Sequence, residues 1–306
     1  MNVKTEGTTE GRVAAAAPNA REESSRVETA HAGARLPHVV VKSEESGVQL
    51  NLGDLWAYRE LLYFLTWRDV KVRYKQTLMG VAWVVVQPLL TMLIFTLVFN
   101  KFARVDTAPV PYPLFAYAGL LVWTFFAGAV SSSTNSLISN TSLVTKVYFP
   151  RAFVPAAAVG AGLVDLGIGS LLLAALAAVY RVETTWTALL LPVFVLLAAM
   201  LALGTGMLAS ALTVKYRDLR HALPFILQFW MFASPVIYPT TIFPPRWRWL
   251  LAINPLTGVL EGFRASLTGL PFDPAFTATS TATAFVLLLV AYYVFRRLED
   301  TFADVI

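Results

Sequence analysis

The chain has no cysteine, three histidines and few charged residues among its 306 positions. The absence of cysteine excludes disulfides and cysteine-ligated metal sites. His31, His38 and His221 are too scattered along the sequence to predict a metal cluster. Charged residues make up 14% of the chain, against about a quarter in a typical soluble domain. Because 57% of the residues are hydrophobic and the mean hydropathy is +0.61, the composition predicts an integral membrane protein.

Several motifs of membrane-bound enzymes are also missing. The sequence has no GxxxxGK[ST] phosphate-binding loop, so we expect no nucleotide hydrolysis by this chain itself. None of its eight Asp residues lies two positions from another, which excludes a DxD site for a sugar nucleotide. His221 has no acid four or five residues downstream, which disfavours the HxxxxD acyltransferase pattern. The energy for any transport must come from an ion gradient or from a partner chain.

The net charge of +5 has two interpretations, nucleic-acid binding or contact with anionic lipid headgroups. In a membrane chain the second is favoured, and we expect no nucleic-acid partner. Residues 1–50 are rich in Ala, Glu, Ser, Thr and Arg without a sustained period, which predicts a disordered cytoplasmic arm. Residues 51–76 predict an amphipathic helix in the headgroup plane, because their uncharged stretch, 61–67, is far shorter than the roughly 20 residues that cross a bilayer.

Residues 77–297 contain the segments that are expected to span the membrane. The six apolar segments are 79–99, 113–134, 153–179, 188–212, 222–238 and 279–295. An even number of spans places both termini, including the tail 298–306, on one side. From Arg59 onward, twelve Lys and Arg residues flank these segments on that side and six on the other, so both termini are predicted to be cytoplasmic.

The connection at residues 240–270 is rich in Trp and Leu and is interrupted by three prolines. It predicts two short helices that re-enter the outer leaflet, where irregular backbone is tolerated only against protein or a wet cavity. A surface helix that rests on lipid through its Trp residues is the alternative.

Asp165 is the one ionisable residue near the middle of a predicted span. Such residues often mark ion paths, so Asp165 keeps an ion-coupled carrier open as a hypothesis. No intramembrane cation or His is evident beside it in the sequence. The favoured interpretation is structural, with Asp165 facing a neighbouring helix across close contacts made by Gly160, Gly162 and Gly167.

Four ordered stretches carry a resemblance to a known family. They are RDVKVRYKQTLMGVAWVVVQPLL, VTKVYFPRAFVPAA, VKYRDLRHALPFILQFWMFASPVIYP and INPLTGVLEGFR. Across residues 55–297 the chain resembles the membrane subunit of ATP-binding cassette exporters of polysaccharides such as O-antigen, capsule or teichoic acid. The resemblance implies an all-α fold with six spans, an N-terminal interface helix, a cytoplasmic coupling helix and two outward re-entrant helices. It also implies a homodimer that docks on two copies of a separate ATPase, which binds the ATP and Mg²⁺.

The resemblance assigns roles by position. The coupling helix would comprise Thr145, Lys146, Val147, Tyr148, Phe149, Pro150 and Arg151. The interface helix would carry Arg59, Tyr63, Trp67, Arg68 and Arg73. The outward gate would include Trp247, Trp249, Asn254, Pro255, Glu261 and Arg264. Taken without the resemblance, the cations of the loops at 139–155 and 214–224 favour membrane anchoring alone over contact with a partner.

A glycan has apolar C–H faces and polar edges, so a passage for it favours aromatic rings and hydroxyls over fixed charges. The candidates for this lining are Gln87, Tyr112, Tyr117, Trp123, Phe126, Trp230 and Phe232. The alternative is an ordinary aromatic belt at the membrane interface.

The function predicted is therefore a non-enzymatic permease for a lipid-linked polysaccharide in the inner membrane of a bacterium. An exporter of small lipids or drugs with the same fold is the first alternative. An ion-coupled carrier and a membrane transferase are less favoured.

Overall fold

The structure is a computed structural model that describes residues 58–75, 80–102, 104–147, 149–183 and 185–305. The predicted arm, 1–50, lies outside these residues. The described chain is helical and contains no strand, as predicted. Its longer helices are α3 (Arg59–Lys75), α4 (Gly80–Phe95), α5 (Tyr112–Ser139), α7 (Phe153–Val179), α8 (Leu191–Lys215), α9 (Leu219–Ala233), α11 (Pro255–Thr268) and α12 (Pro274–Val305). Its shorter ones are η1 (Thr96–Phe102), α6 (Thr141–Lys146), η2 (Trp186–Leu190), η3 (Thr240–Ile242), η4 (Pro245–Trp247) and α10 (Arg248–Ile253).

Five helical segments in the described chain are long and apolar enough to cross a membrane. They are Ala82–Phe102, Tyr112–Ser139, Phe153–Val179, Trp186–Lys215 and Pro274–Glu299. The fifth predicted span, 222–238, is the 15-residue helix α9, followed by extended chain at Ser234. At 1.5 Å per residue α9 is about 22 Å long, which is shorter than the roughly 30 Å hydrocarbon core. The six-span arrangement therefore stays a prediction.

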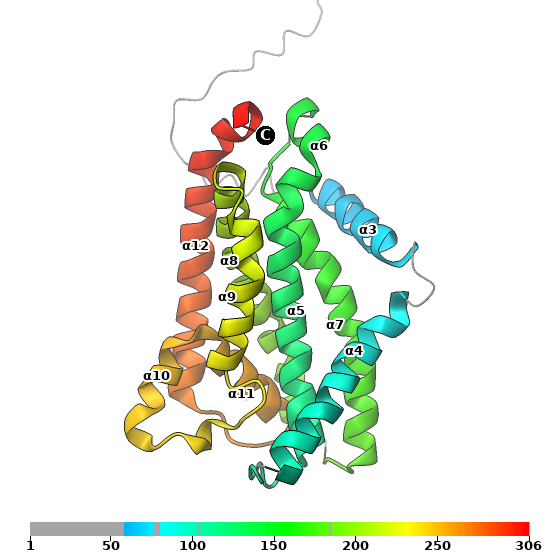
Figure 1. Cartoon of the computed structure of the whole chain (residues 1–306), viewed down its shortest axis with the longest axis vertical. Helices are drawn as coiled ribbons and strands as arrows, with labels where there is room; N and C mark the ends of the chain where they lie inside the picture. Colours follow the sequence, from blue (N-terminus) through cyan, green and yellow to red (C-terminus); the bar gives the residue numbers. More distant parts are fainter. Residues whose placement is uncertain (1–57, 76–79, 103, 148, 184, 306) are drawn as a thin grey trace, which may run out of the picture. The chain divides into compact units, whose positions relative to one another are not determined.

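Helix α5 is the centre of the helical bundle (Figure 1), packing against α7 and α8, while α8 also packs against α12. In the most apolar 18-residue stretch of α5, 78% of the residues are buried, whereas in the corresponding stretch of Ala82–Phe102 only 11% are buried. Small residues permit the close packing. A Cβ at Gly206 of α8 would lie 2.5 Å from Ser133 Oγ of α5, and one at Gly162 of α7 would lie 3.3 Å from the Phe125 ring. At Gly167 the surroundings are open, so that glycine has no such role.

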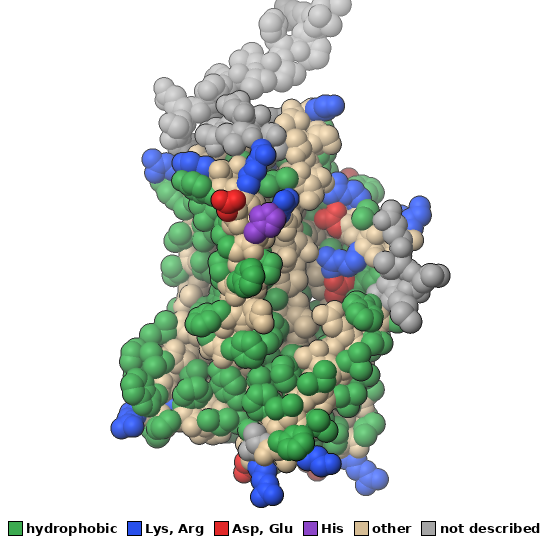
Figure 2. Space-filling model, viewed as in Figure 1, with side chains coloured by type: hydrophobic (Ala, Val, Ile, Leu, Met, Phe, Trp, Pro, Cys, Tyr) green, Lys and Arg blue, Asp and Glu red, His purple; other side chains and the backbone are tan. Residues whose placement is uncertain are grey.

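The bundle has two distinct ends. Helices α3, α6 and the last turns of α12 lie at one, which we call the α6 end, and α10 and α11 lie at the other, the α10 end (Figure 1). Lys and Arg side chains gather near both ends and along α3, whereas hydrophobic side chains cover the region between them (Figure 2). The predicted tail is not separate from the bundle, because α12 continues to Val305 and Phe302 is buried beside Phe295.

Candidate coupling and gate sites

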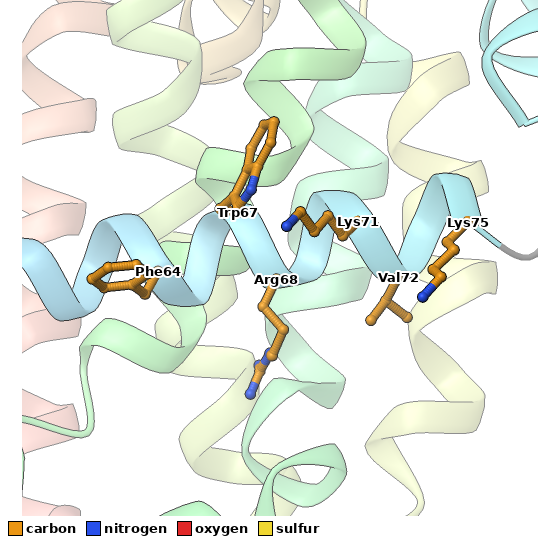
Figure 3. Close-up of a pocket in the computed structure, with 6 residues that line it drawn as sticks. All are labelled: Phe64, Trp67, Arg68, Lys71, Val72 and Lys75. Carbon is orange, nitrogen blue, oxygen red and sulfur yellow. The ribbon is translucent and has the colours of Figure 1, made fainter.

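Helix α3 presents an aromatic and cationic face that no other described helix covers. Leu65 and Val70 are buried on its inner side, which packs against α7. The outer side forms a shallow groove of about 440 Å³ (Figure 3). Its lining comes from α3 alone and comprises Phe64, Trp67, Arg68, Lys71, Val72 and Lys75. The predicted interface residues Arg59, Tyr63, Trp67 and Arg68 are all exposed.

Arg73, the fifth predicted interface residue, instead points inward and binds Asp165. Its Nη1 donates to Asp165 Oδ2, and the hydroxyl of Tyr74 donates to Oδ1. Burial, followed by the hydrogen bond to this carboxylate, raises the pKa of Tyr74 above its ordinary value. The cation missing beside Asp165 in the sequence is thus supplied by another helix, 92 positions away. This contact ties the end of α3 to the middle of α7.

The predicted coupling segment divides into an exposed part and a buried part. Helix α6 ends at Lys146, and Thr145, Lys146 and Val147 are exposed at the α6 end. Tyr148 lies outside the described residues. Phe149 is buried among residues that include Leu65 and Phe295, so the expectation that Phe149 is presented to a partner is wrong for the isolated chain. The cause is packing, which periodicity along a short loop does not reveal.

Arg151 is likewise engaged within the chain. Its backbone N–H donates to Glu299 Oε1 at 2.9 Å, and its guanidinium donates to the Glu299 carbonyl oxygen. Arg296 Nη1 contacts the other oxygen of the same carboxylate at 2.7 Å. These bonds attach the start of α7, and with it the half-buried Pro150, to the end of α12. The exposed coupling surface is therefore smaller than predicted.

Most of the aromatic residues predicted to line a passage are instead packed inside the single chain. Tyr112, Tyr117, Trp123 and Phe126 of α5 are buried. The Tyr112 hydroxyl donates to the Ile237 carbonyl at 2.8 Å, and that of Tyr117 donates to the Gly169 carbonyl at 2.9 Å.

Phe126 stacks edge-on against Trp230, with ring centroids 5.1 Å apart. Trp230 is half-buried, whereas the predicted lining residues Gln87 and Phe232 are exposed. The four buried aromatic residues of α5 are not available to line a passage in this conformation, whereas the lining role of Trp230, Gln87 and Phe232 stays a prediction.

Helix α9 carries an exposed aromatic face of which the sequence analysis had named only Phe232. Phe225, Phe229 and Phe232 are 75%, 77% and 53% exposed and lie on one stripe, because their spacing is four and three residues. Leu223 and Leu227 are buried on the opposite side of the helix. Gln228 is exposed beside the stripe. The signal was present in LRHALPFILQFWMFA as two interleaved helical stripes, one aromatic and one aliphatic.

At the α10 end, Asn254 links the end of α9 to the start of α11. Its Oδ1 accepts hydrogen bonds from Trp230 Nε1 and from the Leu256 N–H, each 3.1 Å long. Its Nδ2 donates to Ser234 Oγ at 2.8 Å. Asn254 is therefore the N-cap of α11, with Pro255 in the favoured first position. The two short helices predicted in 240–270 are present as α10 and α11.

Arg264 is the most buried cation of this region, at 5% exposure. It donates to the carbonyl oxygens of Phe115 at 3.2 Å, Pro235 at 2.7 Å and Val236 at 2.5 Å. Glu261 Oε1 lies 3.2 Å from Nη1. Burial is the main cause that lowers the pKa of Arg264 to about 10, so the guanidinium remains charged at neutral pH.

The predicted gate residues Trp247, at the end of η4, and Trp249, in α10, are 45% and 57% exposed. The predicted outward-gate residues thus divide between a bonded interior, around Asn254 and Arg264, and an exposed aromatic rim. The gating role of this region stays a prediction.

The bundle of long apolar helices, with the cation-rich helix α3 at one end and two short helices at the other, fits a multi-pass membrane protein. The predicted amphipathic character of α3 is not seen, because aromatic and cationic side chains share its exposed face. Residues 60–268 match the model of the ABC-2 type transporter family. The chain therefore belongs to this family, which confirms the resemblance to the membrane subunits of ATP-binding cassette exporters.

Three relatives show which members of the family the chain is similar to. The O-antigen export system permease protein RfbA of Myxococcus xanthus is 32% identical over 255 residues, which cover 82% of this chain and 97% of the relative. The protein of the same name from Klebsiella pneumoniae is 27% identical over 261 residues, 85% of this chain and 98% of the relative. The polysialic acid transport protein KpsM of Escherichia coli is 22% identical over 197 residues, 63% of this chain and 76% of the relative.

Proposed function

We propose that this chain is the membrane half of an ATP-driven exporter that moves a lipid-linked polysaccharide across the cytoplasmic membrane of a bacterium. Two copies form the passage, and two copies of a separate ATPase bind the ATP and Mg²⁺. The observation that carries this proposal is the similarity to O-antigen export permeases along nearly their whole length. Helix α9 adds physical support, because its exposed phenylalanines and Gln228 suit the C–H faces and hydroxyls of a sugar.

The α6 end is assigned to the cytoplasm, and both termini with it. The excess of cations beside the spans on this side follows the positive-inside rule. The groove of α3 and the exposed residues Lys146 and Val147 would meet the ATPase there. Since Arg73 and Tyr74 bind Asp165, a movement of α3 is passed directly to α7. This structural role for Asp165 also counts against an ion-coupled carrier.

Transport in proteoliposomes tests the proposal. The chain is reconstituted with the ATPase encoded beside it, and a lipid-linked glycan is supplied on the ATPase side. We expect ATP-dependent transfer of the glycan to the compartment that a membrane-impermeant glycosidase cannot reach. An ATPase that binds ATP without hydrolysing it is the control. ATP-dependent movement of a small lipid or dye, but not of the glycan, would favour the first alternative, and failure to bind any ATPase would contradict the proposal.

A further inference from the structure

A cavity of about 210 Å³, lined by both charged and apolar side chains, lies at the α10 end and shares no lining residue with the α3 groove or the α9 stripe. It is bounded by the loop before α5, the first turns of α5, residues 239–241, α11 and the start of α12. Pockets that bury drug-sized ligands measure about 300–1,000 Å³. The cavity therefore has room for one small chemical unit and not for a long chain or a whole lipid.

The charged groups in this cavity are only partly used by the protein. Glu261 is paired with Arg264. Asp106 accepts a hydrogen bond from the Ala108 N–H, and Asp273 accepts from the first residues of α12, in both cases through Oδ1 alone. Both residues line the cavity, together with four threonines, Thr107, Thr240, Thr241 and Thr268.

Arg248 contributes a buried hydrogen-bond donor that has no partner among the described residues. Its Nε is buried and makes no hydrogen bond among the described residues, although the side chain lines the cavity. A buried donor left unpaired costs about 1–3 kcal/mol, and native proteins leave few of them. A ligand with an acceptor oxygen in the cavity would satisfy it.

We propose that this cavity binds one neutral sugar ring, a pyranose with several free hydroxyls. Arg248 would donate to hydroxyls of the ring, the threonines would donate or accept, and the carboxylates of Asp106 and Asp273 would accept from the ring hydroxyls. Phe115 and Phe276 supply apolar wall for the C–H face of the ring. Asp106, Asp273 and Arg248 form no ion pair among the described residues, which leaves two negative groups and one positive group at the cavity. The cavity therefore favours a neutral ligand over an anion. The inference deepens the proposed function by placing a saccharide subsite next to Arg264.

Ligand-observed saturation-transfer NMR on the full chain in nanodiscs tests the proposal. The probes are the methyl α-glycosides of glucose, galactose and mannose, with inorganic phosphate followed by ³¹P line width. Arg248→Met removes the unpaired donor, and Arg246→Met is its matched control, since Arg246 lies two positions away and outside the cavity. Thr241→Trp fills the cavity, and Ile242→Trp places the same bulk on an exposed neighbour that does not line it. Thermal unfolding of each variant verifies folding.

We expect at least one glycoside to bind the unaltered chain and both controls. Arg248→Met should weaken this binding about tenfold, the loss of one charge-assisted hydrogen bond, and Thr241→Trp should abolish it. The proposal is overturned if no glycoside binds, if binding survives both cavity variants, or if phosphate alone binds in a manner that depends on Arg248. Any of these results together with intact export in the proteoliposome assay would remove the subsite and leave the permease function standing.

Discussion

Arg264 and Asp165 show two ways in which this apolar chain accommodates charge. Arg264 is surrounded by carbonyl oxygens from α5 and from the chain after α9, with Glu261 beside it. Asp165 receives an arginine and a tyrosine from a helix outside the spans. Both arrangements follow from the high cost of a buried charge that lacks partners. Each also fixes the relative position of two segments that are distant in the sequence.

Gly119 is required by the packing around Arg264. A Cβ there would lie 2.2 Å from Arg264 Nη2 and 2.3 Å from the Val236 carbonyl oxygen. We expect Gly119→Ala to lower the free energy of unfolding by about 1–3 kcal/mol through overpacking. Gly128→Ala in the same helix meets nothing within 4 Å and should be neutral or stabilising. The measurement is unfolding in mixed micelles, and equal shifts for the two variants would refute the packing argument.

The pair Arg73–Asp165 should show energetic coupling. We expect Arg73→Gln and Asp165→Asn to destabilise the α3–α7 contact non-additively, with a coupling energy of about 1 kcal/mol in a double-mutant cycle. The same cycle at Arg68–Asp69, an adjacent and more exposed pair, should give a value near zero. Loss of transport in Asp165→Asn with unchanged stability and unchanged ATPase stimulation would instead indicate a proton-carrying role.

At the scale of the elements, α5 and α9 are both rich in aromatic residues and use them differently. The rings of α5 fill the centre of one chain, because α7 and α8 pack around that helix. Helix α9 contacts the rest of the chain through its leucine side and leaves its phenylalanines uncovered. The uncovered stripe is therefore the better candidate for contact with a glycan or with a second copy.

Phe229 tests the role of the α9 stripe. We expect Phe229→Ala to slow glycan export by about two- to tenfold, the effect of losing one aromatic contact, without lowering thermal stability. Phe285→Ala on α12 is the control, because Phe285 is also exposed but lies on a different helix. Initial transport rates in proteoliposomes make the comparison. A similar loss in both variants would assign the effect to general contacts with lipid.

At the scale of the whole molecule, the described bundle has the cation-rich helix α3 at one end and the short helices α10 and α11 at the other (Figure 1). The proposed exporter would use this asymmetry, with α3 as a surface for the ATPase and the opposite end as a closure for the passage. The bond from Arg73 to Asp165 connects the first of these to the spans.

The lack of cysteine makes the orientation directly measurable. Single cysteines are introduced at Lys146 at the α6 end and at Trp247 at the α10 end, both exposed. In intact spheroplasts a membrane-impermeant maleimide should label Trp247→Cys and spare Lys146→Cys until the membrane is permeabilised. The reverse pattern would invert the proposed topology and move the coupling surface to the wrong side for an ATPase. The unaltered chain, which has no thiol, is the blank.

The sequence alone determined the membrane class, the helical architecture and the two short helices before the last span. These follow from the length of apolar runs, from proline positions and from charge placement, which are local properties. Each of the five candidate spans has a predicted counterpart whose ends differ by at most five residues, and for α7 the predicted range 153–179 coincides with Phe153–Val179. The family followed from four motifs in order.

The tertiary structure alone decided which side chains are available. It placed Phe149 and four aromatic residues of α5 in the interior, gave Asp165 a cation from α3, and left the stripe of α9 uncovered. Pattern along one helix shows that a stripe exists but not which neighbour covers it. Burial, hydrogen bonding and ion pairing depend on residues up to about 150 positions away, so they were settled only when the helices packed.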